Sequence, residues 1–184
     1  APDDADSYHS EIDAWPLQDG PWSAMRVNRE QSRLYLASEE RLATVDIPLD
    51  QGQSSITPTN SLTLSPNILP DSVRVGTSDE YVYALTADGQ GIVRFNANLT
   101  GDSHTFEWPS QYGTAQDIAL LPGTNWLVAS FGPESENQVA INGETGDMRA
   151  VATSGVISMS ADIPGGLLYM LGATGERTLS ALTT

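Results

Sequence analysis

Two arginines, two serines and an aspartate occupy matching places in short apolar stretches that lie far apart in the sequence. Arg26 and Arg74 are the third residue of such a stretch, and Ser72, Asp117 and Ser158 are the first. Guanidinium groups hold carboxylates and phosphates through paired, charge-assisted hydrogen bonds. If the stretches converge, these five residues would bind an anionic ligand. The alternative is that the arginines form salt bridges between neighbouring structural units.

Residues for covalent or metal catalysis are scarce in the chain. The only histidines are His9 and His104, and there is no cysteine, so the ligands of a catalytic zinc site are lacking. No Gly-x-Ser-x-Gly segment provides a nucleophile elbow, and no glycine-rich phosphate-binding motif precedes a helix. We therefore expect no catalytic residue and no cofactor.

Oxygen-rich turns leave calcium open as an alternative. The segments 87–90, 133–137 and 142–147 contain Asp, Glu or Asn, whose side-chain oxygens are calcium ligands. None of the three segments follows the twelve-residue pattern of a calcium-binding loop. Ordinary turns in an acidic protein would have the same composition, so both interpretations stand at this point.

The chain carries a formal charge of −16 over 184 residues, and all eight of its basic residues are arginine. An acidic surface repels phosphate backbones and anionic lipid, and no apolar run approaches the roughly 20 residues that span a bilayer. We therefore expect no nucleic-acid partner and no membrane insertion. Residues 1–7 (APDDADS) are expected to form a disordered acidic tail. Their similarity to a segment left by signal-peptide cleavage predicts an extracytoplasmic protein.

The apolar stretches belong to a repeat. Segments of fifteen residues begin at Ala24, Ser72, Asp117 and Ser158 and align without a gap, at spacings of 48, 45 and 41 residues. Their second residues are all apolar, and so are their eleventh residues, Leu34, Val82, Leu127 and Leu168. A period of roughly 40 to 50 residues with strand-like content is typical of a propeller or a solenoid.

Each repeat has the pattern of about four short antiparallel strands. In the second repeat the predicted strands are Ser72–Val75, Tyr81–Leu85, Ile92–Phe95 and His104–Trp108, separated by turns rich in Gly, Asp and Asn. We place the units at about 8–48, 59–96, 103–142 and 147–182, within a single domain over 8–184. In this register an extra strand around Ile12–Trp15 comes first, and we expect it to complete the sheet of the last unit.

This pattern resembles the YVTN-type, lactonase-like β-propeller repeat. The matching stretches include Leu34-Tyr35-Leu36-Ala37 followed by Thr44-Val45-Asp46, Tyr81-Val82-Tyr83-Ala84, and Leu167-Leu168-Tyr169-Met170. The resemblance implies an all-β propeller of four blade-like units, of a kind found in many secreted and periplasmic proteins. Because propellers have about four to eight blades, the four units would either close on themselves or form half of a larger or shared ring.

Two functions are compatible with these observations. The first is a non-catalytic extracytoplasmic module that binds a protein partner or associates with itself to complete the ring, and the lack of a nucleophile, base or metal cluster favours it. The alternative, which the resemblance implies, is a lactonase-like hydrolase with a metal or polar site in the central channel. Such a site needs three converging ligands, whereas the channel positions offer few carboxylates, namely Asp71, Asp117 and Asp162.

Overall fold

The computed structural model describes residues 16–47, 55–76, 78–135, 137–152, 155–162, 166–172 and 179–183. These residues form four antiparallel sheets, here called blades one to four, in which the strands follow one another in chain order. Blade one contains β1 (Ala24–Val27), β2 (Arg33–Ala37), β3 (Arg41–Asp46) and β4 (Asn60–Thr63). Blade two contains β5 (Arg74–Val75), β6 (Tyr81–Leu85), β7 (Gly91–Asn96) and β8 (His104–Glu107). Blade three contains β9 (Asp117–Leu120), β10 (Trp126–Ser130), β11 (Asn137–Asn142) and β12 (Met148–Ala152). Blade four contains β13 (Val156–Asp162), β14 (Leu167–Gly172) and β15 (Leu179–Thr183), and the short 3-10 helices are η2 (Pro70–Ser72) and η3 (Ser110–Tyr112).

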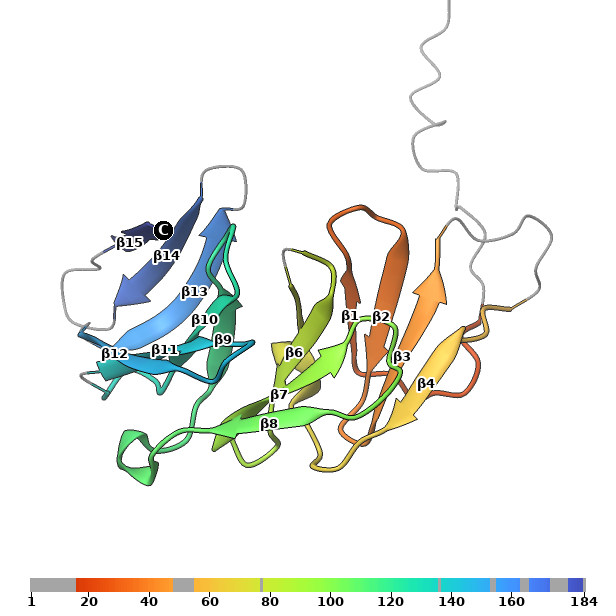
Figure 1. Cartoon of the computed structure of the whole chain (residues 1–184), viewed down its shortest axis with the longest axis horizontal. Coiled ribbons are helices and arrows are strands. Elements are labelled where there is room, and N and C mark those ends of the chain that lie inside the picture. Colours follow the sequence, from red (N-terminus) through yellow and green to blue (C-terminus); the bar gives the residue numbers. More distant parts are fainter. Residues whose placement is uncertain are drawn as a thin grey trace, which may run out of the picture.

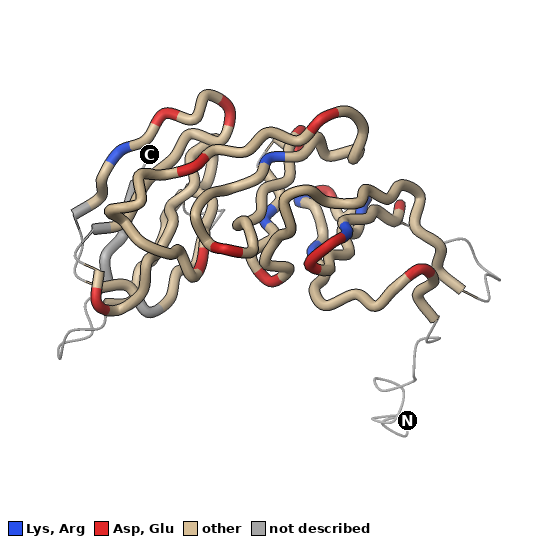
Figure 2. The backbone as a smooth tube through the Cα atoms, turned by 90° about the horizontal axis from the view of Figure 1, so that it is seen from below, with Lys and Arg blue, Asp and Glu red and all other residues tan. Residues whose placement is uncertain are grey.

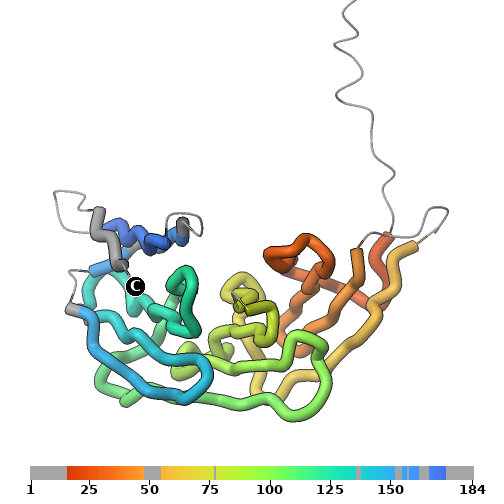
Figure 3. Tube along the Cα trace, turned by 45° about the horizontal axis from the view of Figure 1, so that its top comes forward, coloured from red at the N-terminus to blue at the C-terminus, as the bar shows by residue number. Residues whose placement is uncertain are grey.

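The four blades follow one another around an arc that stays open between blade one and blade four (Figures 1 and 3). The first strand of each blade lies against the first strand of the next, so β1, β5, β9 and β13 form the inner side of the arc. The last strand of each blade lies on the outer side (Figure 1). This is the arrangement of propeller blades that the repeat predicts.

Tight turns hold the strands of a blade together and bring one blade against the next. The turn between β6 and β7 contains Asp88-Gly89, with Gly89 at φ +66°. The N–H of Ala115 donates a 2.8 Å hydrogen bond to the Gly89 carbonyl, and a Cβ on Gly89 would stand 2.7 Å from the Ala115 carbonyl oxygen. Glycine is therefore required here both by the backbone conformation and by the close approach of the segment that leads into blade three.

The apolar core lies between neighbouring blades rather than inside any one sheet. Tyr35 and Leu42 of blade one pack with Val82 and Phe95 of blade two, in one cluster of buried residues. Similar clusters fill the space between blades two and three and between blades three and four. The middle strands β6 and β10 are accordingly buried on both faces except at their first residue, which explains their uninterrupted apolar sequence.

The predicted strand order is present, with one difference in detail. Residues Ser72–Val75 were expected to form an inner strand, but Ser72 ends the 3-10 helix η2 and β5 begins at Arg74. The strands β4, β8 and β12 each pair with the strand that precedes them, so the fourth strand of each blade lies at the start of the next sequence unit, as the permuted register implies. The expected extra strand at Ile12–Trp15, like the tail at 1–7, lies outside the described residues.

Figure 2 shows acidic residues spread over the loops along the whole arc, with far fewer basic ones. In the part of the chain that the structure describes, no helix has the length and apolar character needed to cross a bilayer.

Candidate binding site

Arg26, Arg74 and Asp117 meet on the inner side of the arc. The carbonyl oxygen of Asp71 accepts a 2.8 Å hydrogen bond from Arg26 Nη2 and a 2.9 Å bond from Arg74 Nη1. Arg74 Nη2 lies 2.7 Å from Asp117 Oδ1 in an ion pair, and the same oxygen accepts the N–H of Ile118 at 2.8 Å. These contacts join the inner strands of blades one, two and three. Arg74 forms the salt bridge between blades that the sequence left as an alternative, whereas Arg26 bonds backbone carbonyl oxygens.

The guanidinium of Arg74 is hydrogen-bonded to several protein groups. Burial lowers the pKa of Arg74, and the carboxylate of Asp117 partly opposes this. Besides Asp117 and the Asp71 carbonyl, the Val73 carbonyl accepts a 3.0 Å hydrogen bond from Nη1. An anionic ligand at this position would therefore have to compete with Asp117 for the charge of Arg74.

The two serines predicted with these residues lie elsewhere. Ser72 is buried, its hydroxyl donates to the Leu69 carbonyl at 2.6 Å, and its oxygen accepts the N–H of Leu85 at 2.7 Å. Ser72 therefore fixes η2 against β6 instead of facing a channel. Ser158 is exposed on β13 of blade four, opposite Leu171. The structure thus brings three of the five predicted residues together.

A cleft of about 270 Å³ opens between the inner strands of blades two, three and four. Its walls are mainly apolar, and Arg74 is the charged side chain among the residues that line it, which are Arg74, Val75, Ala119, Leu120, Pro122, Met159, Ser160 and Ala161. A hydrolytic site needs a group that activates a nucleophile or a water molecule. These lining residues include no carboxylate or histidine for that purpose, and their apolar walls suit an apolar ligand.

The oxygen-rich turns use their side chains to close themselves. Asp88 accepts hydrogen bonds from the Thr86 hydroxyl and the Gln90 N–H, which lower its pKa. Asn142 Oδ1 accepts the N–H groups of Glu144 and Thr145 at 2.9 and 3.1 Å. Across the described ranges, no three His, Asp or Glu side chains gather where they would hold a metal ion. The turn at 133–137 includes a residue outside those ranges.

His104 and Trp108 contribute no reactive group to the inner side of the arc. His104 is exposed on β8, and its ring lies 4.5 Å from the Phe106 ring in a tilted arrangement. His9 lies outside the described residues. Trp108 is buried and packs edge-on against Phe131, with 5.3 Å between the ring centroids, which is the usual structural role of a tryptophan between blades.

An apolar surface that the sequence did not reveal covers the free face of blade one. Met25 and Val27 are 56% and 48% exposed, and they pair with Leu36 and Leu34. Directly paired residues point to the same side of a sheet, and Leu34 and Leu36 belong to a small cluster separate from the one shared with blade two. Met25 and Val27 therefore point away from blade two, toward the open end of the arc.

The free face of blade four is also partly uncovered. Along β14, buried and half-buried residues alternate, in contrast to β6 and β10, in which every residue after the first is buried. Leu168 and Met170 pack against Val128 of blade three, so the alternate residues, which are Leu167, Tyr169 and Leu171, point away from blade three. Each end of the arc thus presents one sheet face that no other described blade covers.

Comparison with known proteins supports the fold and gives no family. No protein-family profile matches the chain, and no curated protein matches it. Among solved structures, the chain is similar to the β-propeller domain of Cps50 (Swd1) from Myceliophteria thermophila, with 15% identity, a TM-score of 0.65, and coverage of 89% of this chain and 51% of that one. It is also similar to a chain of the mitotic checkpoint complex, with 14% identity, a TM-score of 0.61, and coverage of 89% and 49%.

A third similar structure is a putative 6-phosphogluconolactonase from Bacteroides fragilis, with 12% identity, a TM-score of 0.55, and coverage of 88% of this chain and 53% of that one. At these identities the likeness establishes the fold alone. The chain is an all-β protein with the β-propeller fold, built from a propeller-type repeat. It spans about half the length of the solved structures that it matches.

Proposed function

We propose that this chain is a non-catalytic propeller module that binds protein partners through the two free blade faces of its arc. The observation that carries the proposal is the exposure of apolar residues at repeat positions that are buried between interior blades. Met25 is 56% exposed, whereas Val73 and Ile118, which occupy the same repeat position in blades two and three, are 1% and 0% exposed. An apolar face of this kind marks an interaction surface.

The similar chain solved within the mitotic checkpoint complex supports a role in protein assembly. That support is limited to the fold, so the partner of this chain has to be identified by experiment. The resemblance to the YVTN-type repeat supports a further part of the proposal, namely that the module works outside the cytoplasm. Fractionation of the source cells tests the location, and recovery of the protein only from the cytoplasm would overturn it.

The lactonase-like alternative has less support from the inner strands. Asp117 is held by Arg74 at 2.7 Å, and the described residues offer no second and third ligand beside it for a metal. A direct assay of lactone hydrolysis, with and without added calcium, tests this alternative. Turnover that is lost on substitution of Asp117→Asn, with the fold retained, would replace the binding proposal by the hydrolase.

The binding proposal is tested by recovering partners from the source organism with tagged chains. We expect Met25→Asp to abolish recovery of partners, because it places a charge on the apolar face of blade one. The matched control is Gln111→Asp, which adds the same charge at an exposed residue of η3. If both variants recover the same proteins as the original chain, the free face of blade one is not a binding surface.

A further inference from the structure

Neighbouring blades are joined by a tyrosine contact that points in one direction along the arc. Tyr35 on β2 of blade one is buried, and its hydroxyl donates a 3.1 Å hydrogen bond to the carbonyl oxygen of Ala97 in blade two. Arg33 reinforces the contact, because its Nη1 lies 3.3 Å from the same carbonyl and 2.6 Å from Asn98 Oδ1. Blade one therefore provides the tyrosine, and blade two receives it.

A tyrosine also lies at the corresponding place between blades two and three, although its hydroxyl has no hydrogen-bond partner among the described residues. Tyr83 occupies the position of Tyr35 in the repeat, and it lies against Gly143 so closely that a Cβ on that glycine would overlap its ring. Gly143 corresponds to Ala97, because each follows the asparagine that ends the third strand of its blade. Each also donates its N–H to the loop before the second strand, Ala97 to Glu80 at 2.9 Å and Gly143 to Asn125 at 2.7 Å.

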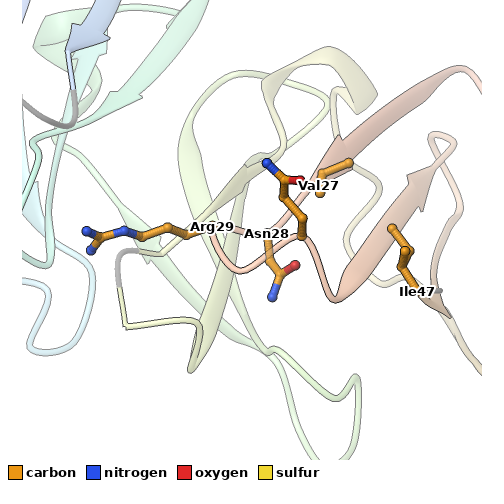
Figure 4. A pocket seen from close by; sticks show the side chains of 5 residues that line it. Val27, Asn28, Arg29 and Ile47 are labelled. Carbon is orange, nitrogen blue, oxygen red and sulfur yellow. The ribbon is translucent and has the colours of Figure 1, made fainter.

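Blade one has the same receiving position at Ile47. The N–H of Ile47 donates to the Ser32 carbonyl at 2.8 Å, as its counterparts do in blades two and three. No tyrosine of the described residues lies there. Instead, a pocket of about 420 Å³ opens at this point, lined by Val27, Asn28, Arg29, Gln31 and Ile47 (Figure 4). Trp22 and Ile56 cover only the neighbouring part of this face, over Leu36, Ala43 and Val45.

Blade four presents a tyrosine at the providing position. Tyr169 is the counterpart of Tyr35 and Tyr83 in the repeat, and it lies on the face of β14 that points away from blade three. Blade four, which carries Tyr169, and blade one, which carries the pocket, lie at opposite ends of the open arc (Figure 3). One end of the arc thus carries a tyrosine at the providing position, and the other end has an uncovered receiving position at Ile47.

We propose that Tyr169 of one copy of this chain docks in the Val27–Ile47 pocket of a second copy, so that two arcs associate end to end and close a ring through two identical contacts. The proposal rests on the proposed function, and it identifies the partner as a second copy. It continues an interface that this chain already makes twice within itself, between blades one and two and between blades two and three. The matched structures, which are about twice as long as this chain, support a ring of that size.

The first test is the mass of the purified chain by light scattering after size exclusion, over a series of concentrations and in high salt, which screens the repulsion between two acidic copies. We expect about twice the 19.7 kDa mass of one chain. A mass of one chain at every concentration would overturn the proposal. If partners are nevertheless recovered through the face of Met25, the proposed binding function stands without self-association.

Two variants connect the dimer to the tyrosine contact. Tyr169→Ala should weaken association by about 30-fold, as expected for truncation of an aromatic side chain in a central pocket, and Tyr169→Phe should weaken it less. Val27→Asp places a charge in the pocket and should produce a monomer, whereas Gln111→Asp should leave the dimer intact. A dimer that tolerates both Tyr169→Ala and Val27→Asp would overturn the proposed contact.

Cross-linking distinguishes the end-to-end contact from a face-to-face one. Because the chain has no cysteine, the variants Ile47→Cys and Tyr169→Cys each carry a single thiol. A short bis-maleimide should link the two variants when they are mixed and should give little product with either variant alone. Efficient linkage of Ile47→Cys to itself would show that like faces meet, which contradicts the proposal.

Discussion

The carboxylate of Asp117 accepts a 2.7 Å hydrogen bond from the guanidinium of Arg74, and this ion pair joins the inner strands of blades two and three. Arg74 also bonds the carbonyl oxygen of Asp71, which Arg26 bonds from blade one. The Asp71 carbonyl therefore bonds an arginine from blade one and an arginine from blade two, and the second of these forms the ion pair with Asp117. The inner side of the arc is held by polar contacts, while the space between the sheets is filled by apolar residues.

Loss of this contact should lower stability without affecting the blades themselves. We expect Arg74→Ala to reduce the free energy of unfolding by about 1 kcal/mol, a modest value because the pair is partly exposed to solvent. Urea unfolding measures the change. Arg149→Ala is the matched control, since Arg149 is exposed and stacks over Trp126 at 4.9 Å. An equal or larger loss in the control would contradict a special role for Arg74.

The two interior tyrosines should respond differently to removal of the hydroxyl group. Tyr35→Phe should cost about 1 kcal/mol, because it removes the hydrogen bond to the Ala97 carbonyl. The Tyr83 hydroxyl is buried without a hydrogen-bond partner among the described residues, so Tyr83→Phe should leave the free energy of unfolding unchanged or raise it. Urea unfolding measures the stability of both variants. A large loss of stability in Tyr83→Phe would show that the Tyr83 hydroxyl does make a hydrogen bond in the folded protein.

Tyr83 should also make stability depend on pH in the alkaline range. Burial raises the pKa of Tyr83 to about 12, with Arg94 opposing the rise and Glu144 adding to it. In the unfolded chain the pKa is about 10. The contribution of Tyr83 is therefore constant below about pH 10 and is lost as the pH rises through about 12, because the unfolded state releases its proton first.

Unfolding experiments at a series of alkaline pH values measure this effect. The slope of the unfolding free energy against pH should be smaller in Tyr83→Phe than in the original chain. Identical slopes would show that Tyr83 does not titrate abnormally. Absorbance of the tyrosinate group in the folded protein gives an independent measure of its pKa.

A methyl group at Gly143 should separate the two blades that meet there. The added Cβ would overlap the ring of Tyr83, which is fully buried and cannot move away. We expect Gly143→Ala to lower the free energy of unfolding by about 2 kcal/mol. Gly101→Ala represents the opposite case, because no atom lies within 4 Å of its added Cβ but its φ is +83°, whereas Gly143 is not among the glycines with positive φ. Thermal unfolding measures the stability of both variants, and an unchanged stability in Gly143→Ala would argue against the overlap.

The strands were predictable because their apolar positions recur in every repeat. Leu34, Val82, Leu127 and Leu168 all lie on the second strand of a blade, as their shared position predicts. Ser72 was placed wrongly in a strand because Pro70 begins a 3-10 helix that ends at Ser72, and the repeat pattern carries no signal for it. Arg26, Arg74 and Asp117 were predicted to meet, but the sequence left open whether they would serve a ligand or one another.

The free faces could not be predicted from residue type. Met25 and Val73 are both apolar and occupy the same repeat position, yet one is 56% exposed and the other 1%. The difference lies in the presence or absence of a neighbouring blade, which no local pattern records. Such positions stand out only where the exposure of equivalent residues differs between repeats, as it does for Met25 and Val73.

Blades one and two each direct a tyrosine toward the next blade, and blade three directs Val128 from the same repeat position, so the two ends of the arc are different. Subunits that associate head to tail can add further copies without limit, because each added copy leaves one binding position unoccupied, unless the ring closes. The angle through which each arc turns then decides whether the assembly is a closed ring or an open fibre. If two arcs do not turn through a full circle, the same contact yields an open helical fibre, so substitutions that flatten the arc should turn a soluble assembly into filaments.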